Sequence, residues 1–197
     1  MKTINNRTTK YSIDDNFLKR YSPRAMSGEA VSKDELMTLF EAARWAPSAY
    51  NVQPWRFIYA MRETKEFDIL LSLLVDFNKT WCIKAGALIA VISKKTSENA
   101  KGEKKENTTH SFDAGSAWEN LALQASKMNL VAHGMSGLDY ALAKEKLSIP
   151  DDYSVEMMIA VGKHGKIEDL PEAMRAGEKP SDRKPLEEIV FEGKFTA

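Results

Sequence analysis

The segment from Ser111 to Met128 constrains the fold most strongly, because it predicts a long helix that needs cover on several sides. Apolar residues recur along this segment at the three- and four-residue spacing of one helical stripe. The stripe consists of Ala114, Ala117, Trp118, Leu121, Ala125 and Met128, and it is widened by Ala122 and Leu123. Since alanines permit a close approach between helices, we expect this helix to contribute to a subunit interface.

The remaining periodicity predicts strands interspersed with helices. Helices are expected at 33–46, where Ser32 and Glu35 form a capping box, at 67–74 and at 138–147. Strands are expected at 55–61, 87–92 and 155–161, with a last short strand at 189–191. The polar run from Lys94 to Thr109 is expected to be a solvated loop. Because the pattern lacks a regular βαβ alternation, it indicates a single domain, residues 1–197, of the α+β or mixed α/β class.

Composition excludes several classes of protein and site. The 28 basic side chains are balanced by 28 acidic ones, which argues against a partner that is a nucleic acid or an anionic membrane. No apolar stretch is long enough to span a bilayer and the N-terminus lacks a signal-peptide core, so we expect a cytoplasmic protein. The single cysteine, Cys82, is expected to be a small buried hydrophobe, and the three scattered histidines lack the spacing of a metal site.

A first segment with chemical potential is Arg20-Tyr21-Ser22-Pro23-Arg24. Two guanidinium groups and a hydroxyl within five residues can converge on one phosphate, because arginine offers a planar pair of donors and serine a compact one. Taken alone, the motif is also compatible with a solvated basic turn.

A second segment, Ala46–Trp55, joins a predicted helix to a predicted strand. It is bracketed by Pro47 and Pro54 and contains serine, asparagine and glutamine side chains. Amide side chains carry both donors and acceptors, which recognition of the edge of a heteroaromatic ring requires. A rigid turn is the alternative interpretation.

The third segment is Gly134-Met135-Ser136-Gly137, between a strand-like stretch and a helix. Two glycines allow a backbone to approach a flat ligand closely. The spacing matches neither a nucleophile elbow nor a phosphate-binding loop of nucleotide hydrolases. Because no combination of nucleophile, base and orienting residue is present, we expect a bound cofactor to supply any catalytic reactivity.

In combination, these segments resemble the nitroreductase family of FMN-dependent oxidoreductases. The matching elements, in order, are Arg-x-Ser-x-Arg, Ala-Pro-Ser-x-x-Asn-x-Gln-Pro-Trp, an asparagine before the apolar strand, the glycine-containing turn, and the basic element Ser181-Asp182-Arg183. The resemblance implies a central, mainly antiparallel sheet flanked by helices, in an intertwined homodimer with FMN at the subunit interface.

The resemblance also implies roles for individual residues. Residues assigned to the FMN phosphate, ribityl chain and pyrimidine side are Arg20, Tyr21, Ser22 and Arg24, with Arg183 approaching the phosphate. Residues assigned to a segment that reaches the flavin of the other subunit are Pro47, Ser48, Ala49 and Asn51, with Gln53 in support. Asn78 is placed against the isoalloxazine edge, and the turn Met135, Ser136 and Gly137 directs backbone N–H groups to flavin N5 and O4.

The activity implied is reduction of a small-molecule acceptor, such as a nitroaromatic or a quinone, by NADH or NADPH. Hydride transfer is expected to run through flavin N5 in a ping-pong cycle, with no side chain assigned as an obligatory acid or base. Relatives with this scaffold also carry out dehalogenation, dehydrogenation or flavin breakdown, and a flavin-binding protein without turnover or an interaction domain without a cofactor are further alternatives. Ser136 and Trp81 depart from the family pattern, which often has an acidic residue and a basic residue at these two places.

Overall fold

A four-stranded antiparallel sheet forms the centre of the computed structural model, which describes residues 2–98 and 101–196. The strand order is β3-β4-β8-β7, and each neighbouring pair is antiparallel. The strands are β3 (Trp55–Met61), β4 (Ala87–Lys94), β7 (Leu130–Met135) and β8 (Tyr153–Lys163). This arrangement confirms the α+β class and the mainly antiparallel sheet.

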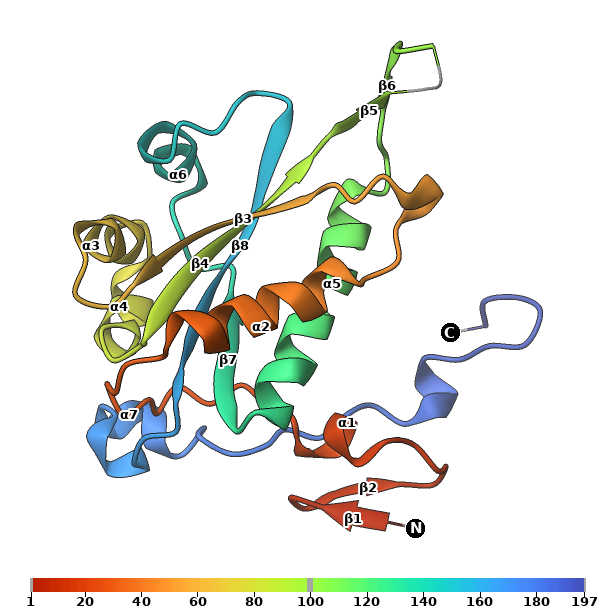
Figure 1. Cartoon of the computed structure of the whole chain (residues 1–197). Coiled ribbons are helices and arrows are strands. Elements are labelled where there is room, and N and C mark those ends of the chain that lie inside the picture. Colours follow the sequence, from red (N-terminus) through yellow and green to blue (C-terminus); the bar gives the residue numbers. More distant parts are fainter. Residues whose placement is uncertain (1, 99–100, 197) are drawn as a thin grey trace.

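Helices cover both faces of the sheet, as Figure 1 shows. One face carries α2 (Lys33–Arg44) and α5 (His110–Lys127), and the other carries α3 (Lys65–Ser72), α4 (Asp76–Cys82) and α6 (Tyr140–Lys146). Strand β4 is buried along almost its whole length because its side chains alternate between the two cores. Leu88 and Ala90 face the α3–α4 side, whereas Ile89 and Val91 face the α2–α5 side.

Sequence periodicity locates the long elements well. Helix α2 begins with the expected capping box between Ser32 and Glu35. Helix α5 buries Ala114, Ala117 and Leu121 against the sheet, as its stripe predicts. The shorter elements are the hairpin β1 (Lys2–Ile4) and β2 (Arg7–Thr9), helix α1 (Asp15–Lys19), helix α7 (Glu172–Arg175), and the 3₁₀ turns η1 (Ala49–Asn51), η2 (Ile167–Asp169) and η3 (Leu186–Glu188).

Two expectations are wrong. The run from Lys94 to Thr109 is not a simple loop, because β5 (Thr96–Glu98) and β6 (Lys104–Glu106) form an antiparallel hairpin in it. Its strands are stabilised by backbone pairing and lack the apolar alternation by which a strand is recognised in a sequence. Residues 189–191 form no strand, because the C-terminal segment projects from the body after η3 and lies beside no other strand (Figure 1).

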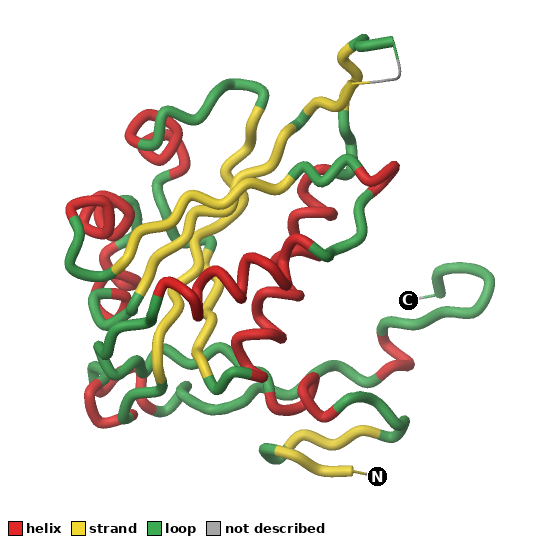
Figure 2. Tube along the Cα trace, viewed as in Figure 1, coloured by secondary structure: helices red, strands yellow, loops and turns green. Residues whose placement is uncertain are grey.

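Residues 20–27, which we call the strap, run as loop along the lower end of the sheet (Figure 2). The strap is joined to the end of β8 by two backbone bonds, from the Ser27 N–H to the Lys163 carbonyl at 3.0 Å and from the Gly165 N–H to the Ala25 carbonyl at 2.9 Å. The contact at Gly165 is close, since a Cβ there would lie 2.5 Å from the carbonyl carbon of Met26.

Of the helices in the described part of the chain, none is long and apolar enough to cross a membrane.

Substitution Gly165→Ala should lower the free energy of unfolding by about 1–3 kcal/mol, because the added methyl group collides with backbone atoms of the strap that cannot rotate away. Gly115→Ala on α5 is the matched control, since a Cβ there has no described atom within 4 Å and alanine favours the helix. Urea unfolding of both variants measures the difference. Equal stability of the two variants would show that the strap does not lie against β8 as described.

Candidate functional site

Cationic side chains from three parts of the chain line one small cavity of about 230 Å³. They come from β2, from the strap and from residues 177–183, which we call the tail segment. The lining consists of Arg7, Arg20, Tyr21, Ser22, Arg24, Gly177, Lys179, Ser181 and Arg183. Guanidinium groups and hydroxyls around a cavity of this size provide the donors that a phosphate group requires.

The buried carboxylate of Glu178 holds the strap to the tail segment. Its Oε1 accepts hydrogen bonds from the backbone N–H groups of Arg24 and Ala25, the second at 2.8 Å. Its Oε2 lies 3.8 Å from Nη1 of Arg24. The carboxylate therefore replaces the backbone partners that a regular element would offer the strap, and it neutralises part of the positive charge beside the cavity.

Positive charge exceeds negative charge around the cavity, although Nε of Arg20 lies 3.7 Å from Oε1 of Glu119 and Arg24 is paired with Glu178. The pKa of Arg7 is lowered mainly by burial and further by the nearby charges of Arg183 and Arg20. Burial and the carboxylate of Glu178 raise the pKa of the Tyr21 phenol, so this group is a neutral donor at physiological pH. Since converging cations repel one another, an anion in the cavity would lower the energy of the whole cluster.

His133 links the strap to the sheet. Its Nδ1 lies 3.0 Å from the carbonyl oxygen of Pro23, so Nδ1 is protonated and donates a hydrogen bond to that oxygen. The imidazole packs against the Trp81 ring with centroids 4.7 Å apart, and burial is the main cause of a lowered pKa. His133 lies on β7, which leads directly into the third predicted segment.

That segment forms a shorter turn than the sequence suggests. Gly134 and Met135 belong to β7, and Met135 is buried with its Sδ 3.4 Å from Sγ of Cys82, so the turn consists of Ser136 and Gly137. The β7–β8 ladder includes both strand residues, which is why the glycine pattern did not mark the boundary. Cys82 is buried, as expected, and burial raises its pKa well above the ordinary value.

Asn78 on α4 fixes the orientation of this turn. Its Nδ2 donates to the Gly137 carbonyl at 3.1 Å, and the Val75 N–H donates to the same oxygen at 3.0 Å. A Cβ on Gly137 would lie 2.7 Å from Nδ2 of Asn78, so the close approach requires glycine. The Ser136 carbonyl accepts from the Leu138 N–H at 3.0 Å, and in a trans peptide the Gly137 N–H points the opposite way.

Helix α4 also contacts the strap. The Arg24 guanidinium lies 6.0 Å from the centre of the Phe77 ring, and Phe77 is 56% exposed. Through Arg24, Phe77 and His133, the cation cavity, α4 and the turn at Ser136–Gly137 form one continuous region. Trp81, one of the two departures from the expected pattern, is buried.

The segment Pro47–Gln53 lies at the other end of α2, away from the strap (Figure 1). Its loop is held internally, because Ser48 Oγ accepts from the Gln53 N–H at 3.0 Å and Gln53 Nε2 donates to the Asn51 carbonyl at 2.9 Å. Tyr50, Asn51 and Gln53 all adopt positive φ angles, of 50°, 55° and 51°. Such a conformation is costly for these residue types and requires the fixing contacts around it.

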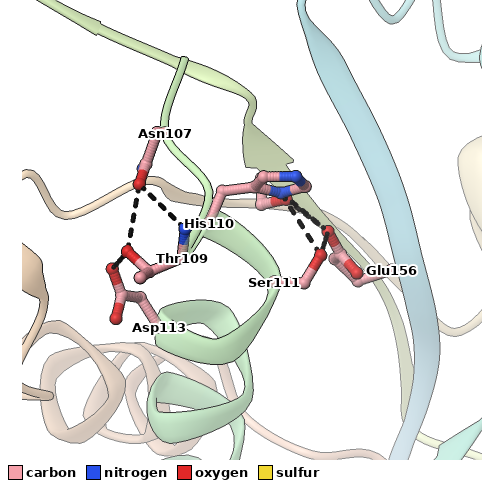
Figure 3. Close-up of polar contacts among 7 residues, drawn as sticks. Asn107, Thr109, His110, Ser111, Asp113 and Glu156 are labelled. Carbon is pink, nitrogen blue, oxygen red and sulfur yellow. Dashed lines mark hydrogen bonds and ion pairs between the residues drawn. The ribbon is translucent and has the colours of Figure 1, made fainter. Parts of the chain in front are cut away.

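Two polar clusters at the start of α5 fix this loop and the helix (Figure 3). In the first, the buried carboxylate of Asp113 accepts from the Ala49 N–H at 3.2 Å and from Oγ1 of Thr109 at 3.0 Å.

In the second cluster, the Ser93 hydroxyl on β4 donates a hydrogen bond to the Glu156 carboxylate on β8. The Ser93 Oγ lies 2.7 Å from Nδ1 of His110. Since that serine has only one proton, Nδ1 of His110 is the donor to Ser93. The two sheet strands and the start of α5 are therefore joined through His110.

The predicted site residues fall into two groups. The structure brings together the strap residues, Arg183, Asn78 and the turn, and it leaves Pro47, Ser48, Ala49, Asn51 and Gln53 at a distance within one chain. Residues that the sequence reasoning missed are Arg7, Phe77, His133, Glu178 and Lys179. They lie outside the quoted motifs, although Phe77 and His133 directly precede the predicted residues Asn78 and Gly134.

Comparison with known proteins identifies the fold. The model of the nitroreductase family matches residues 18–73 and 71–163. The chain belongs to the nitroreductase family. A solved structure described as an oxidoreductase containing FMN has a TM-score of 0.96 and 44% identity, over 100% of this chain and 99% of that one. A Desulfovibrio desulfuricans protein solved in complex with FMN has a TM-score of 0.71 and 26% identity, over 92% of this chain and 96% of that one.

Curated relatives are more distant in sequence. A Thermus thermophilus protein named NADH dehydrogenase is 25% identical over 207 residues, which cover 88% of this chain and 92% of that protein. An oxygen-insensitive NADPH nitroreductase of Helicobacter acinonychis is 39% identical over 67 residues, which cover 34% of this chain and 31% of that protein. The expected nitroreductase-like fold is thus confirmed.

Stability of this nitroreductase fold should decrease on acidification through His133. The pKa of His133 is lower in the native state than in the unfolded chain. As the pH falls through about 6.5, the unfolded chain therefore binds a proton at this residue before the native state does. The stability that wild type has over His133→Gln should therefore fall between about pH 7.5 and about pH 5.5 in urea unfolding. His164, whose pKa burial also lowers, is present in both proteins and cancels. A difference independent of pH would contradict a His133 side chain that stays neutral in the folded protein.

Removal of the Asp113 carboxylate should loosen the segment Pro47–Gln53. Asp113→Ala leaves the Ala49 N–H without its acceptor, at a cost of about 1–3 kcal/mol, whereas the Thr109 hydroxyl can still donate to Oδ1 of Asn107 at 3.0 Å. Hydrogen exchange should accelerate at the amides of residues 49–53, and Asp113→Asn, which keeps an acceptor oxygen, should restore part of the protection. Asp68→Ala on the exposed face of α3 is the control. Unchanged exchange in Asp113→Ala would show that the loop is held by other contacts.

Proposed function

We propose that this protein is an FMN-dependent NAD(P)H oxidoreductase that reduces a small-molecule acceptor of the nitroaromatic or quinone class. The observation that carries the proposal is the convergence of Arg7, Arg20, Arg24, Lys179 and Arg183 on one cavity. Family membership and the relatives with FMN in their descriptions support the choice of cofactor. Bound FMN would supply the redox chemistry, accepting a hydride from NADH or NADPH and passing reducing equivalents to the acceptor.

The residues present fit the phosphate end of FMN. Ser22, with Arg20, Arg24 and Arg183, offers a hydroxyl and three guanidinium groups to a dianion. Each charge-assisted hydrogen bond contributes about 1.5–3 kcal/mol before ordering costs, so a few of them account for micromolar affinity or better. The excess of cations over anions around the cavity independently supports an anionic ligand, because such a cluster is costly unless an anion binds.

The turn after β7 fits the role of a donor to the ring. With the Ser136 and Gly137 carbonyls bonded to other groups, the Gly137 N–H is directed to the opposite side. A fixed backbone donor stabilises negative charge that develops on a bound ring without reorganisation. Asn78 keeps this donor in place, and Met135 anchors the end of the strand. We assign no side chain as an obligatory acid or base.

A second copy of the chain completes the proposed site. The segment Pro47–Gln53 is separated from the strap by α2, whose 12 residues extend about 18 Å. Exposed aromatic side chains surround this segment, with Trp45 72%, Tyr50 101% and Phe112 79% exposed in the single chain. The C-terminal segment also exposes Ile189, Val190 and Phe195 as it projects from the body. Burial of these surfaces in a homodimer would bring Pro47, Ser48, Ala49 and Asn51 to the FMN of the partner.

We also propose a cytoplasmic location, since a single buried free cysteine is compatible with a reducing compartment. The balanced charge supports a small-molecule substrate over a nucleic-acid or membrane partner.

An absorption spectrum of the purified protein, followed by anaerobic titration with NADH and NADPH, tests the cycle. We expect the absorption bands of bound FMN, bleaching by at least one nicotinamide, and recovery on addition of a nitroaromatic or a quinone. A flavoprotein that only artificial donors reduce would contradict the reductase and favour a flavin-binding protein without turnover. A colourless protein that ignores added FMN would end the proposal.

Replacement of both Arg20 and Arg183 by alanine should raise the dissociation constant of FMN by more than about a hundredfold, because two charge-assisted contacts to the phosphate are lost. The double variant Arg62→Ala/Lys65→Ala removes two positive charges outside the cavity and should bind FMN like wild type. Quenching of flavin fluorescence on binding provides the measurement. Equal FMN affinity of the two double variants would refute the phosphate role of the two arginines.

A further inference from the structure

Arg7 lies outside the region that the family model matches, yet it lines the phosphate cavity. It belongs to β2 of the N-terminal hairpin and is 6% exposed. A buried arginine needs partners for its donors, since an unpaired cation is costly to bury. The hydrogen-bond partners of Arg7 therefore indicate its structural role.

The guanidinium of Arg7 joins two segments that are far apart in the sequence. Its Nη1 donates to the carbonyl of Leu18, at 3.0 Å, and to the carbonyl of Arg20. Its Nε donates to the carbonyl of Ser181 at 2.8 Å. One planar group thus fixes the backbone at the start of the strap and in the tail segment.

These contacts are to neutral carbonyls, so they do not compensate the positive charge of Arg7. Burial, Arg183 and Arg20 lower the pKa of Arg7, and Asp182 offsets only part of this effect. A structure that buries a cation between two others is favourable only when a compensating anion is present. The phosphate cavity is the place for such an anion.

We propose that Arg7 is a positioning residue of the phosphate site, which sets Arg20 and the tail segment at the separation that lets them bind one dianion. The inference rests on the proposed FMN-binding function and extends the site to the N-terminal hairpin. It implies that loss of Arg7 affects the phosphate end of the ligand and leaves contacts with the ring system unchanged. Comparison of FMN with riboflavin, which has the same ring but no phosphate, isolates that end.

The test measures dissociation constants for FMN and riboflavin with wild type, Arg7→Met and Arg7→Lys. We expect Arg7→Met to weaken FMN binding by about tenfold or more and riboflavin binding by less than about threefold. Arg7→Lys keeps the charge but cannot bridge three carbonyls in a plane, so it should still lose FMN affinity, by at least about threefold. Arg62→Met is the matched control, because Arg62 also donates to backbone carbonyls, those of Ile83 and Ala85, away from the cavity.

Several outcomes would overturn the inference. These are wild-type FMN affinity in Arg7→Met, full FMN affinity in Arg7→Lys, or equal losses for both ligands. If Arg7→Met does not fold, as judged by circular dichroism, the Arg7→Lys comparison decides the matter alone. Failure of wild type to bind FMN would instead refute the proposed function, so the two failures are distinguishable.

Discussion

The part of the strap that carries the cationic groups, residues 20–24, has no secondary structure of its own, and the candidate site depends on the side chains that fix its backbone. Glu178 accepts from two strap N–H groups, His133 donates to the carbonyl of Pro23, and Arg7 donates to the carbonyl of Arg20. Pro23 removes one backbone donor from the middle of the strap, so regular pairing is not available there. These side chains supplement the two backbone bonds between the strap and the end of β8, and such bonds give a loop the rigidity that ligand binding requires.

The two-sided sheet determines where the rest of the site can lie. Helix α4 lies on one side, where it contacts the strap through Phe77 and holds the turn after β7 through Asn78, whereas α2 and α5 lie on the other side and hold the segment Pro47–Gln53. Contacts across one chain cannot bring these regions together, because α2 separates them. This separation explains why the site motifs of the sequence form two spatial groups, and why we infer that a partner subunit supplies the second group.

Local features of the sequence were predictable because they depend on neighbouring residues. The capping box of α2, the stripe of α5 and the two-sided burial of β4 each follow from a pattern within one segment. Contacts of Arg7 and Glu178 with the strap and the tail segment join residues up to 174 positions apart, and no local sequence pattern predicts such contacts. The β5–β6 hairpin was missed for a different reason, since its polar strands contain no apolar residues to produce alternation. Motif spacing located Arg20, Ser22 and Arg183, but the structure was needed to show that they share a cavity.

The state of the phosphate of bound FMN tests the central claim most directly. Free phosphate monoesters take up a proton with a second pKa of about 6, whereas a dianion held by several guanidinium groups resists protonation. The ³¹P resonance of FMN bound to the protein should therefore stay constant between about pH 5.5 and about pH 8, without the titration shift of free FMN. A bound phosphate that titrates like free FMN would show that the converging cations do not grip it, and the account would fail.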